Sequence, residues 1–211
     1  MTRFLITGGA GFIGSHLCEL LAEKGHRVVA VDDLSTGRIE NIQPLQELPN
    51  FQFVRDSIHN QIVLDRLTSE SQVVIHLAAA VGVRLIVDDP VRTITTNVMG
   101  SEAVLTTANR YGCKVLIAST SEVYGKGVQI PFKEGDDRLM GSTTHSRWAY
   151  ATSKAIDEYM ALAYHRQFSL PVVVMRFFNT IGPRQTGQYG MVVPRFVRQA
   201  LRGEALTVYG D

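Results

Sequence analysis

The chain is poor in cysteine and tryptophan and has no excess of either charge. Its 211 residues include two cysteines, one tryptophan, and 21 lysines and arginines against 20 aspartates and glutamates. Cys18 and Cys113 are too few for a disulfide framework, so we expect buried free thiols and a reducing, cytoplasmic setting. A net charge of +1 gives no field that would attract nucleic acid or a membrane surface, and neither is expected as a partner.

Long apolar runs and metal-ligand clusters are also missing from the sequence. No run approaches the roughly 20 residues of a membrane-spanning helix, so no such helix is predicted. The N-terminus leads directly into a strand-like segment, and we expect no signal peptide before it. His59, His76 and His165 lack the spacing of a metal site, so no bound metal is predicted.

Strand-length apolar runs alternate with segments of helical periodicity along the chain. This alternation predicts an α/β fold with a doubly wound parallel sheet of the Rossmann type. The expected strands are 3–7, 27–31, 51–54, 72–76, 114–118 and 171–176, and the expected helices are 12–24, 38–47, 60–69, 91–111, 147–167 and 193–202. Residues 125–146 are expected to form an irregular active-site loop, and residues 206–211 a strand without a closing element.

A glycine-rich turn joins the first expected strand to the first expected helix. Gly8, Gly11 and Gly14 leave room for a pyrophosphate to approach the helix N-terminus. Free N–H groups in the first turn, where Phe12 and Ile13 lie, and the helix dipole would hold that anion. The spacing predicts a dinucleotide site, although an ordinary glycine-rich turn also accounts for it.

An acidic residue follows the second expected strand. Asp32 lies in the window where a carboxylate receives the hydroxyls of an adenosine ribose, and Asp33 next to it belongs to the same predicted site. The carboxylate would repel a 2′-phosphate. The sequence therefore predicts NAD, rather than NADP, as the cofactor.

Tyr150 and Lys154 stand four residues apart on an expected helix, which places both side chains on one face. A free tyrosine titrates near 10, about three units too high for a base near neutrality, a cost of about 4 kcal/mol. A neighbouring ammonium and a positive nicotinamide ring stabilise a phenolate by that order. We therefore predict Tyr150 as the proton acceptor and Lys154 as its partner, both touching the cofactor; an incidental helical pair is the alternative.

Four motifs together resemble the extended short-chain dehydrogenase/reductases, and within them the NAD-dependent nucleotide-sugar epimerases, dehydratases and decarboxylases. The motifs are residues 8–15, 76–79, 119–125 and 150–154, and they follow the family's order over essentially the whole chain. The resemblance implies an NAD-binding Rossmann domain at 1–178. It also implies that 179–211 begins a C-terminal substrate domain that is mostly absent from this sequence.

The resemblance implies roles for individual residues. Besides the residues above, it implies cofactor contacts from Asp56, Ser57, Leu77, Ala78, Ala79 and Asn97, catalysis by Thr120 and Glu122, and substrate contacts from Ser121, Asn179, Arg184 and Arg84. Arg84 would pair with a substrate carboxylate or phosphate through a charge-assisted bond. A solvated loop arginine remains the alternative for that residue.

The reaction implied by the resemblance passes through the 4-keto form of a nucleotide-diphosphate sugar. The run Thr120-Ser121-Glu122 resembles the UDP-glucuronate decarboxylases, and a serine at its centre disfavours the dehydratases. Residues 82–84 resemble the UDP-glucuronate 4-epimerases instead. We expect a UDP-glucuronate decarboxylase, with a UDP-sugar 4-epimerase and a non-catalytic, truncated NAD-binding module as alternatives.

The helices expected at 91–111 and 147–167 carry apolar residues on more than one face. Family members pair two such helices with those of a second copy, so the resemblance implies a homodimer. Packing against the sheet accounts for part of the same pattern.

Overall fold

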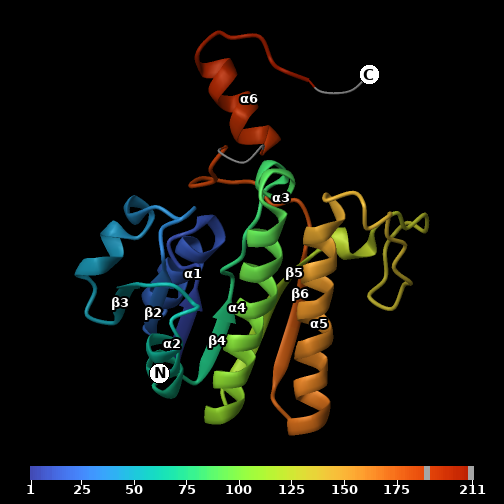
Figure 1. The fold of residues 1–211 in the computed structure, drawn as a ribbon. Coiled ribbons are helices and arrows are strands. Elements are labelled where there is room, and N and C mark those ends of the chain that lie inside the picture. Colours follow the sequence, from blue (N-terminus) through green and yellow to red (C-terminus); the bar gives the residue numbers. More distant parts are fainter. Residues whose placement is uncertain (188–190, 209–211) are drawn as a thin grey trace.

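The computed structural model describes residues 1–187 and 191–208, with the side chains of residues 83–85 excepted. Its centre is a six-stranded parallel sheet with the strand order β3-β2-β1-β4-β5-β6 (Figure 1). The strands are β1 (Arg3–Thr7), β2 (Arg27–Asp32), β3 (Phe51–Arg55), β4 (Val73–His76), β5 (Lys114–Thr120) and β6 (Val172–Phe177). The predicted doubly wound parallel sheet is confirmed. Its order reverses between β1 and β4, where such sheets bind ligands.

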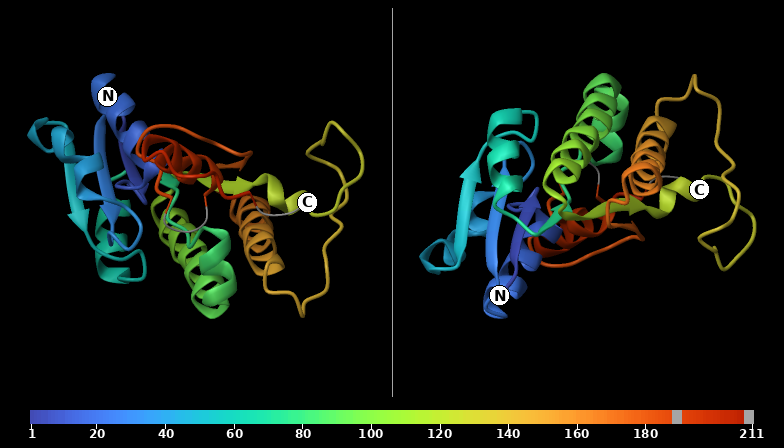
Figure 2. Two further views of the ribbon diagram at one scale, coloured as in Figure 1. Left: turned by 90° about the horizontal axis from the view of Figure 1, so that it is seen from above. Right: turned by 90° about the horizontal axis from the view of Figure 1, so that it is seen from below.

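Helices cover the sheet on both faces. The α-helices of the described residues are α1 (Phe12–Glu23), α2 (Gln61–Ser69), α3 (Val83–Asp88), α4 (Pro90–Tyr111), α5 (Trp148–Phe168) and α6 (Val192–Leu201). Apolar residues of α2, α4 and α5 form one core cluster with the central strands, and residues of α1 form another. Figure 2 shows α4 and α5 on one side of the sheet and α1 on the other. No residue of α6 is buried, and this helix lies beyond the carboxyl edge of the sheet (Figure 1).

The strand register brings the ends of neighbouring strands to one edge. Thr7, the last residue of β1, pairs with Val31 on β2 and with His76, the last residue of β4. The segments that follow β1, β2 and β4 therefore emerge side by side. This edge is where the predicted site residues gather.

One helix prediction is wrong. Residues 38–47 form two short 3₁₀ helices, η1 (Ile39–Asn41) and η2 (Gln43–Glu47), instead of an α-helix. Pro44 has no N–H to donate and clashes with the preceding turn, so an α-helix cannot run through it. The other predicted helices and the six strands predicted between residues 3 and 176 agree with the structure to within two residues, whereas α3 and a 3₁₀ turn, η3 (Ser121–Tyr124), were not predicted.

The remaining expectations about the chain have mixed outcomes. Residues 125–146 contain no helix or strand, apart from one isolated bridge between Gly125 and Leu139, which confirms an irregular loop. Residues 206–208 form no strand, and residues 209–211 lie outside the described part. Cys18 and Cys113 are buried free thiols as predicted, while the reducing, cytoplasmic setting stays a prediction. Of the described helices, none is long and apolar enough to cross a membrane.

Candidate active site

The glycine turn after β1 is shaped by close backbone approach. Gly8 has a φ of +70° and donates its N–H to the Val31 carbonyl at 2.9 Å. A Cβ at Gly8 would lie 2.8 Å from the Ala78 nitrogen, and one at Gly14 would overlap the Gly8 carbonyl oxygen. A side chain at either position would clash with backbone, so glycine allows the turn to approach the segment after β4 and the start of α1 this closely.

The N-terminus of α1 lies at this turn with free donors. Gly11 is its N-cap and provides no side-chain hydrogen bond, so the N–H groups of Phe12 and Ile13 have no partner within the helix. The helix dipole adds a partial positive charge at the same end. An open glycine cradle with free N–H groups fits the diphosphate of a dinucleotide.

Asp32 closes the other side of the turn. Its buried carboxylate accepts hydrogen bonds from the Ala10 N–H at 3.0 Å and the Leu34 N–H at 2.8 Å, which ties the end of β2 to the glycine turn. Burial raises the pKa of Asp32, the backbone hydrogen bonds oppose that shift, and the charge of Asp33 adds to it. Asp33 itself is exposed and accepts a hydrogen bond from the Ser35 N–H at 2.9 Å.

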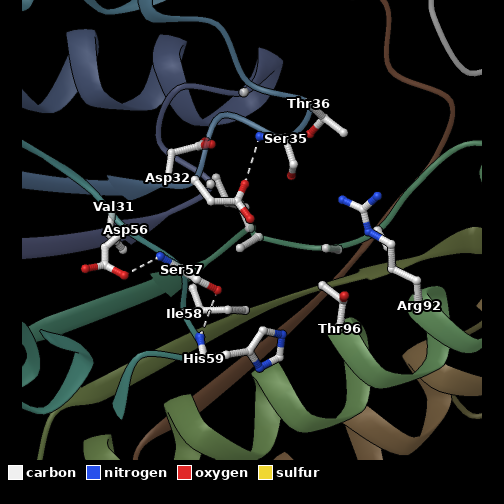
Figure 3. A pocket seen from close by; sticks show the side chains of 17 residues that line it. Val31, Asp32, Ser35, Thr36, Asp56, Ser57, Ile58, His59, Arg92 and Thr96 are labelled. Carbon is white, nitrogen blue, oxygen red and sulfur yellow. Dashed lines mark hydrogen bonds between the residues drawn. The ribbon is translucent and has the colours of Figure 1, made fainter. Parts of the chain in front are cut away.

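A cleft of about 280 Å³ joins these groups at the carboxyl edge of the sheet (Figure 3). Its walls come from the glycine turn, the segments after β2, β3 and β4, and the first turns of α4. Nine predicted cofactor residues line it: Gly8, Gly11, Asp32, Asp33, Asp56, Ser57, Leu77, Ala78 and Ala79. His59, Arg92 and Thr96 line it too, and the sequence analysis did not select them.

The segment after β3 is held by its own polar groups. The Asp56 carboxylate accepts hydrogen bonds from the Ser57 N–H at 2.7 Å and from the Asn60 side-chain amide at 3.1 Å. The Ser57 hydroxyl oxygen accepts one from the His59 N–H at 3.2 Å. Figure 3 shows Asp56, Ser57 and His59 along one wall of the cleft. Contact of Asp56 with an adenine stays a prediction.

Asn97 links a residue of the cleft wall, Ala80, to helix α5, which carries Tyr150. It is buried on α4, accepts a hydrogen bond from the Ala80 N–H at 2.8 Å and donates one to the Ser153 hydroxyl at 3.1 Å. These bonds fix the segment after β4 against α4 and α5. Asn97 does not line the cleft itself, and its predicted contact with the cofactor stays a prediction.

Tyr150 lies in the first turn of α5 and is almost fully buried. Burial raises the pKa of its phenol well above the usual range, the charge of Glu122 raises it further, and a hydrogen bond with Thr120 opposes the shift. Thr120 is the last residue of β5, and its hydroxyl also accepts a hydrogen bond from the Glu122 N–H at 3.2 Å. The structure thus brings the predicted groups Thr120, Glu122 and Tyr150 together.

Lys154 lies one turn after Tyr150 and forms a buried ion pair that the sequence analysis missed. Its Nζ donates to Asp157 Oδ2 at 2.6 Å, and the two side chains are 3% and 0% exposed. Burial raises the pKa of Asp157, and the Lys154 charge opposes that shift. The i, i+3 spacing on a helix was the available signal for this pair.

Glu122 and Ser121 lie in η3, which follows β5. Partial desolvation raises the pKa of Glu122, and the positive charge of Arg147 opposes the rise. Arg147 precedes α5 and stacks on Trp148, with its guanidinium carbon 4.8 Å from the ring centroid. A carboxyl group with a raised pKa beside a buried phenol is suited to proton transfer.

A second buried network supports these groups from behind. Arg176 on β6 donates to both oxygens of Glu158, from Nε at 2.9 Å and from Nη2 at 2.7 Å, and Ser119 also donates to Glu158. The Arg176 guanidinium carbon lies 4.7 Å from the centroid of the Tyr124 ring. These contacts tie β5, β6 and α5 to η3, and sequence spacing does not predict them because the partners lie on different elements.

Three of the four residues predicted to bind substrate remain to be placed: Asn179, Arg184 and Arg84. Asn179 is exposed after β6 and does not line the cleft. Arg184 pairs with Glu19 on α1, from Nη2 to Oε2 at 2.7 Å. The side chain of Arg84 lies outside the described part of the structure. Their roles in substrate binding stay predictions.

His76 is buried at the end of β4, where its Nδ1 lies 2.8 Å from the Thr7 hydroxyl. Burial, with a smaller contribution from the charge of Lys154, lowers the pKa of His76 to about 3. The imidazole is therefore neutral near neutral pH. Within the described residues, no group of three or more potential ligands could hold a metal ion.

Comparison with known proteins agrees with this geometry. Residues 4–211 match the family described as "NAD dependent epimerase/dehydratase family", and the chain belongs to this family. A UDP-N-acetyl-alpha-D-glucosaminuronate decarboxylase from Bacillus cytotoxicus is 45% identical over 99% of this chain and 64% of its own length. UDP-glucuronic acid decarboxylase 4 from Arabidopsis thaliana is 41% identical over 99% of this chain and 46% of its own length.

A solved structure shows the same fold with ligands. The UDP-glucuronic acid 4-epimerase from Bacillus cereus, in complex with UDP-glucuronic acid and NAD, superposes with a TM-score of 0.89 at 34% identity. The superposition covers 99% of this chain and 66% of the epimerase chain. This chain therefore spans about half to two thirds of the length of the proteins that it matches.

Proposed function

We propose that this member of the NAD dependent epimerase/dehydratase family decarboxylates a UDP-hexuronate, with UDP-glucuronate as the preferred candidate, through a 4-keto intermediate. One observation carries the proposal: Thr120, Tyr150 and the Lys154–Asp157 pair gather at the edge of the sheet that also bears the glycine cleft. The two decarboxylase relatives support the choice of reaction.

The cleft fits NAD. The glycine turn and the free N–H groups of α1 would hold the diphosphate, and the Asp32 carboxylate would receive the ribose hydroxyls. The Asp32 carboxylate has about four acceptor sites, and backbone N–H groups of Ala10, Leu34 and Gly11 use no more than three of them, which leaves acceptor capacity for a ribose. NAD held there would supply the acceptor, and later the donor, of a hydride at C4 of the sugar.

Tyr150 accepts the proton of the C4 hydroxyl in the first half of the reaction. The C4–H and O–H bonds break together with formation of the ketone, and the phenol must be ionised to take the proton. Burial, Glu122 and Asp157 all oppose that ionisation in the free chain. The Lys154 ammonium and the positive nicotinamide ring would counter them, so the base becomes active only in the assembled complex.

Glu122 supplies a proton after oxidation. A ketone at C4 makes the C5 carboxylate part of a β-keto acid, whose C5–C6 bond breaks to release carbon dioxide and leave an enolate. Desolvation raises the pKa of Glu122, which favours the protonated carboxyl group that can donate to C5. Ketone reduction at C4 with return of the proton from Tyr150 completes the cycle.

A 4-epimerase is the second candidate. The likeness to the Bacillus cereus 4-epimerase favours it, because the same tyrosine and cleft serve both reactions until the ketone forms. The two reactions then diverge. Decarboxylation requires protonation at C5, whereas epimerisation requires the keto-sugar to rotate in the site, so that reduction at C4 occurs on its opposite face. A non-catalytic cofactor-binding module is the third candidate, since the residues that line the cleft lie between Gly8 and Thr96 and do not include Thr120 or Tyr150.

Mass spectrometry of the sugar nucleotide separates the three candidates. The chain is incubated with NAD and UDP-glucuronate, with Tyr150→Phe as the control. Decarboxylation predicts a product lighter by one carbon dioxide that does not form with Tyr150→Phe. A product of unchanged mass with a different sugar would establish epimerisation instead, and no product at all would support the binding module.

We also propose that the chain forms a homodimer through α4 and α5. These adjacent helices expose large apolar side chains on their outer faces: Val91, Ile94, Met99, Ile156, Tyr159 and Leu162. Apolar groups in such numbers on neighbouring helices are suited to a protein interface. Sedimentation equilibrium should give twice the monomer mass, and a Tyr159→Glu variant should sediment as a monomer.

A further inference from the structure

We propose that Arg92 binds the diphosphate of the dinucleotide and determines much of its affinity. This role rests on the proposed cofactor cleft, and it is independent of the reaction that follows. Neither the glycine motif nor the predicted ribose contact points to Arg92.

The position of Arg92 is set by the start of α4. Its N–H donates to Asp89 Oδ1 at 3.1 Å, which caps the helix and fixes the first turn. Its side chain lines the cleft, as does Thr96 one turn later. Figure 3 shows the Arg92 guanidinium rising from α4 into the space below Ser35 and Thr36.

The guanidinium has no partner of its own in the described part of the chain. Arg92 is exposed, and its side chain makes no hydrogen bond or ion pair with the described residues. Arginine presents its donors in a planar fork that matches a phosphate group with two parallel bonds. The Arg92 guanidinium is therefore available to bind an anionic ligand in the cleft.

The side chains that line the cleft carry an excess of negative charge, which disfavours an anionic ligand unless a cation offsets it. Three carboxylates line it, those of Asp32, Asp33 and Asp56, and Arg92 is the one lysine or arginine among its described lining residues. A diphosphate brings two negative charges into this setting. The N-terminus of α1 offers only about half a positive charge, so a full positive charge on the opposite wall would substantially favour binding.

Two other cations near the site are already engaged. Lys154 is buried against Asp157 at 2.6 Å. Arg184 pairs with Glu19 at 2.7 Å. Arg92 is therefore the described cation that is both free and within the cleft.

Calorimetry with Arg92→Gln tests the proposal through binding alone. Titrations with NAD and with ADP measure the contact with the diphosphate, and NMR titration with adenosine measures the base and ribose. Loss of one charge-assisted contact should weaken NAD and ADP by about tenfold and leave adenosine unchanged. The salt dependence of ADP binding should also become shallower.

Arg66→Gln is the matched control. Arg66 is exposed on α2, does not line the cleft and carries the same charge, so its loss should leave ADP binding unchanged. If the two variants weaken ADP binding equally, the effect comes from net charge alone and the proposal is overturned. The proposal is also overturned if Arg92→Gln binds ADP as tightly as the wild type does, or if it loses affinity for adenosine as much as for ADP. If the wild type binds neither NAD nor ADP, the cleft itself is misassigned and the role of Arg92 falls with it.

Discussion

Asp157→Asn removes one charge from the buried pair with Lys154 and keeps nearly the same shape. The ammonium is 3% exposed and its carboxylate partner 0% exposed, so water cannot replace the lost charge. The asparagine oxygen can still accept the Lys154 hydrogen bond, but it no longer balances the positive charge. The variant therefore leaves a cation uncompensated beside the phenol that we propose as the base.

The expected cost follows from this burial. Removing one partner of a buried ion pair destabilises a protein by about 3–5 kcal/mol. Because the amide keeps the hydrogen bond, we expect the lower end, about 3 kcal/mol in the free energy of unfolding. In a chain of this size that corresponds to a fall in melting temperature of roughly 6–12 °C.

Asp65→Asn is the matched control for the measurement. Asp65 forms an ion pair with Arg110 in which the side chains are 32% and 57% exposed. Exposed pairs contribute about 1 kcal/mol or less. Urea denaturation of the two variants and the wild type compares a buried pair with an exposed one in the same fold.

A second readout comes from the pH dependence of turnover. The negative charge of Asp157 raises the pKa of Tyr150, so its removal lowers that pKa, and ionised Tyr150 is reached at lower pH. The rise of kcat/KM with pH should therefore move to lower pH in Asp157→Asn. A variant with wild-type stability and an unmoved pH profile would refute the importance of this pair.

Four further predictions concern single residues. Tyr150→Phe should lower turnover by about 10² or more while calorimetry shows unchanged NAD binding; a near-normal rate would remove Tyr150 from the mechanism. Asp32→Ala should weaken NAD binding, relax discrimination against NADP and destabilise the chain, since the buried Ala10 N–H and the part-buried Leu34 N–H lose their acceptor; an unchanged preference for NAD over NADP would contradict the ribose contact. Glu122→Gln should slow carbon dioxide release more than hydride transfer, and equal slowing of both steps would argue against a role after oxidation. The pKa of His76 is about 3 in the folded chain and 6.5 for the free side chain. As the pH falls from 6.5 toward 3, the unfolded chain binds a proton at this residue and the folded chain does not, so the free energy of unfolding declines by up to about 1.4 kcal/mol per pH unit. His76→Gln should therefore flatten the plot of unfolding free energy against pH over that range.

The sequence predicts the sheet, and brings to one cleft nine of the residues proposed to bind the cofactor, because local patterns encode both. Gly8 and Gly14 lie where backbone meets backbone, and Asp32 follows directly from the end of β2. Pro44 shows the limit of periodicity: the apolar spacing over 38–47 is helical, but one missing N–H turns the segment into two 3₁₀ pieces. A six-residue helix such as α3 gives too short a pattern to detect.

The contacts that support the site are harder to predict from sequence. Arg176 and Glu158 lie on different elements, and Arg184 meets Glu19 across 165 positions of the chain. Such pairs depend on how α1, α5 and β6 are placed around the sheet, which no local pattern records. Arg92 is a similar case, because only the tertiary arrangement shows that its exposed side chain enters the cleft.

Titration of the folded chain with NAD tests the central claim most directly. The account predicts heat of binding that saturates at one NAD per chain and is competed away by ADP, because both ligands would place a diphosphate on the glycine turn. Circular dichroism of the same sample establishes that the chain is folded. A folded sample that gives no binding signal with NAD would contradict the account.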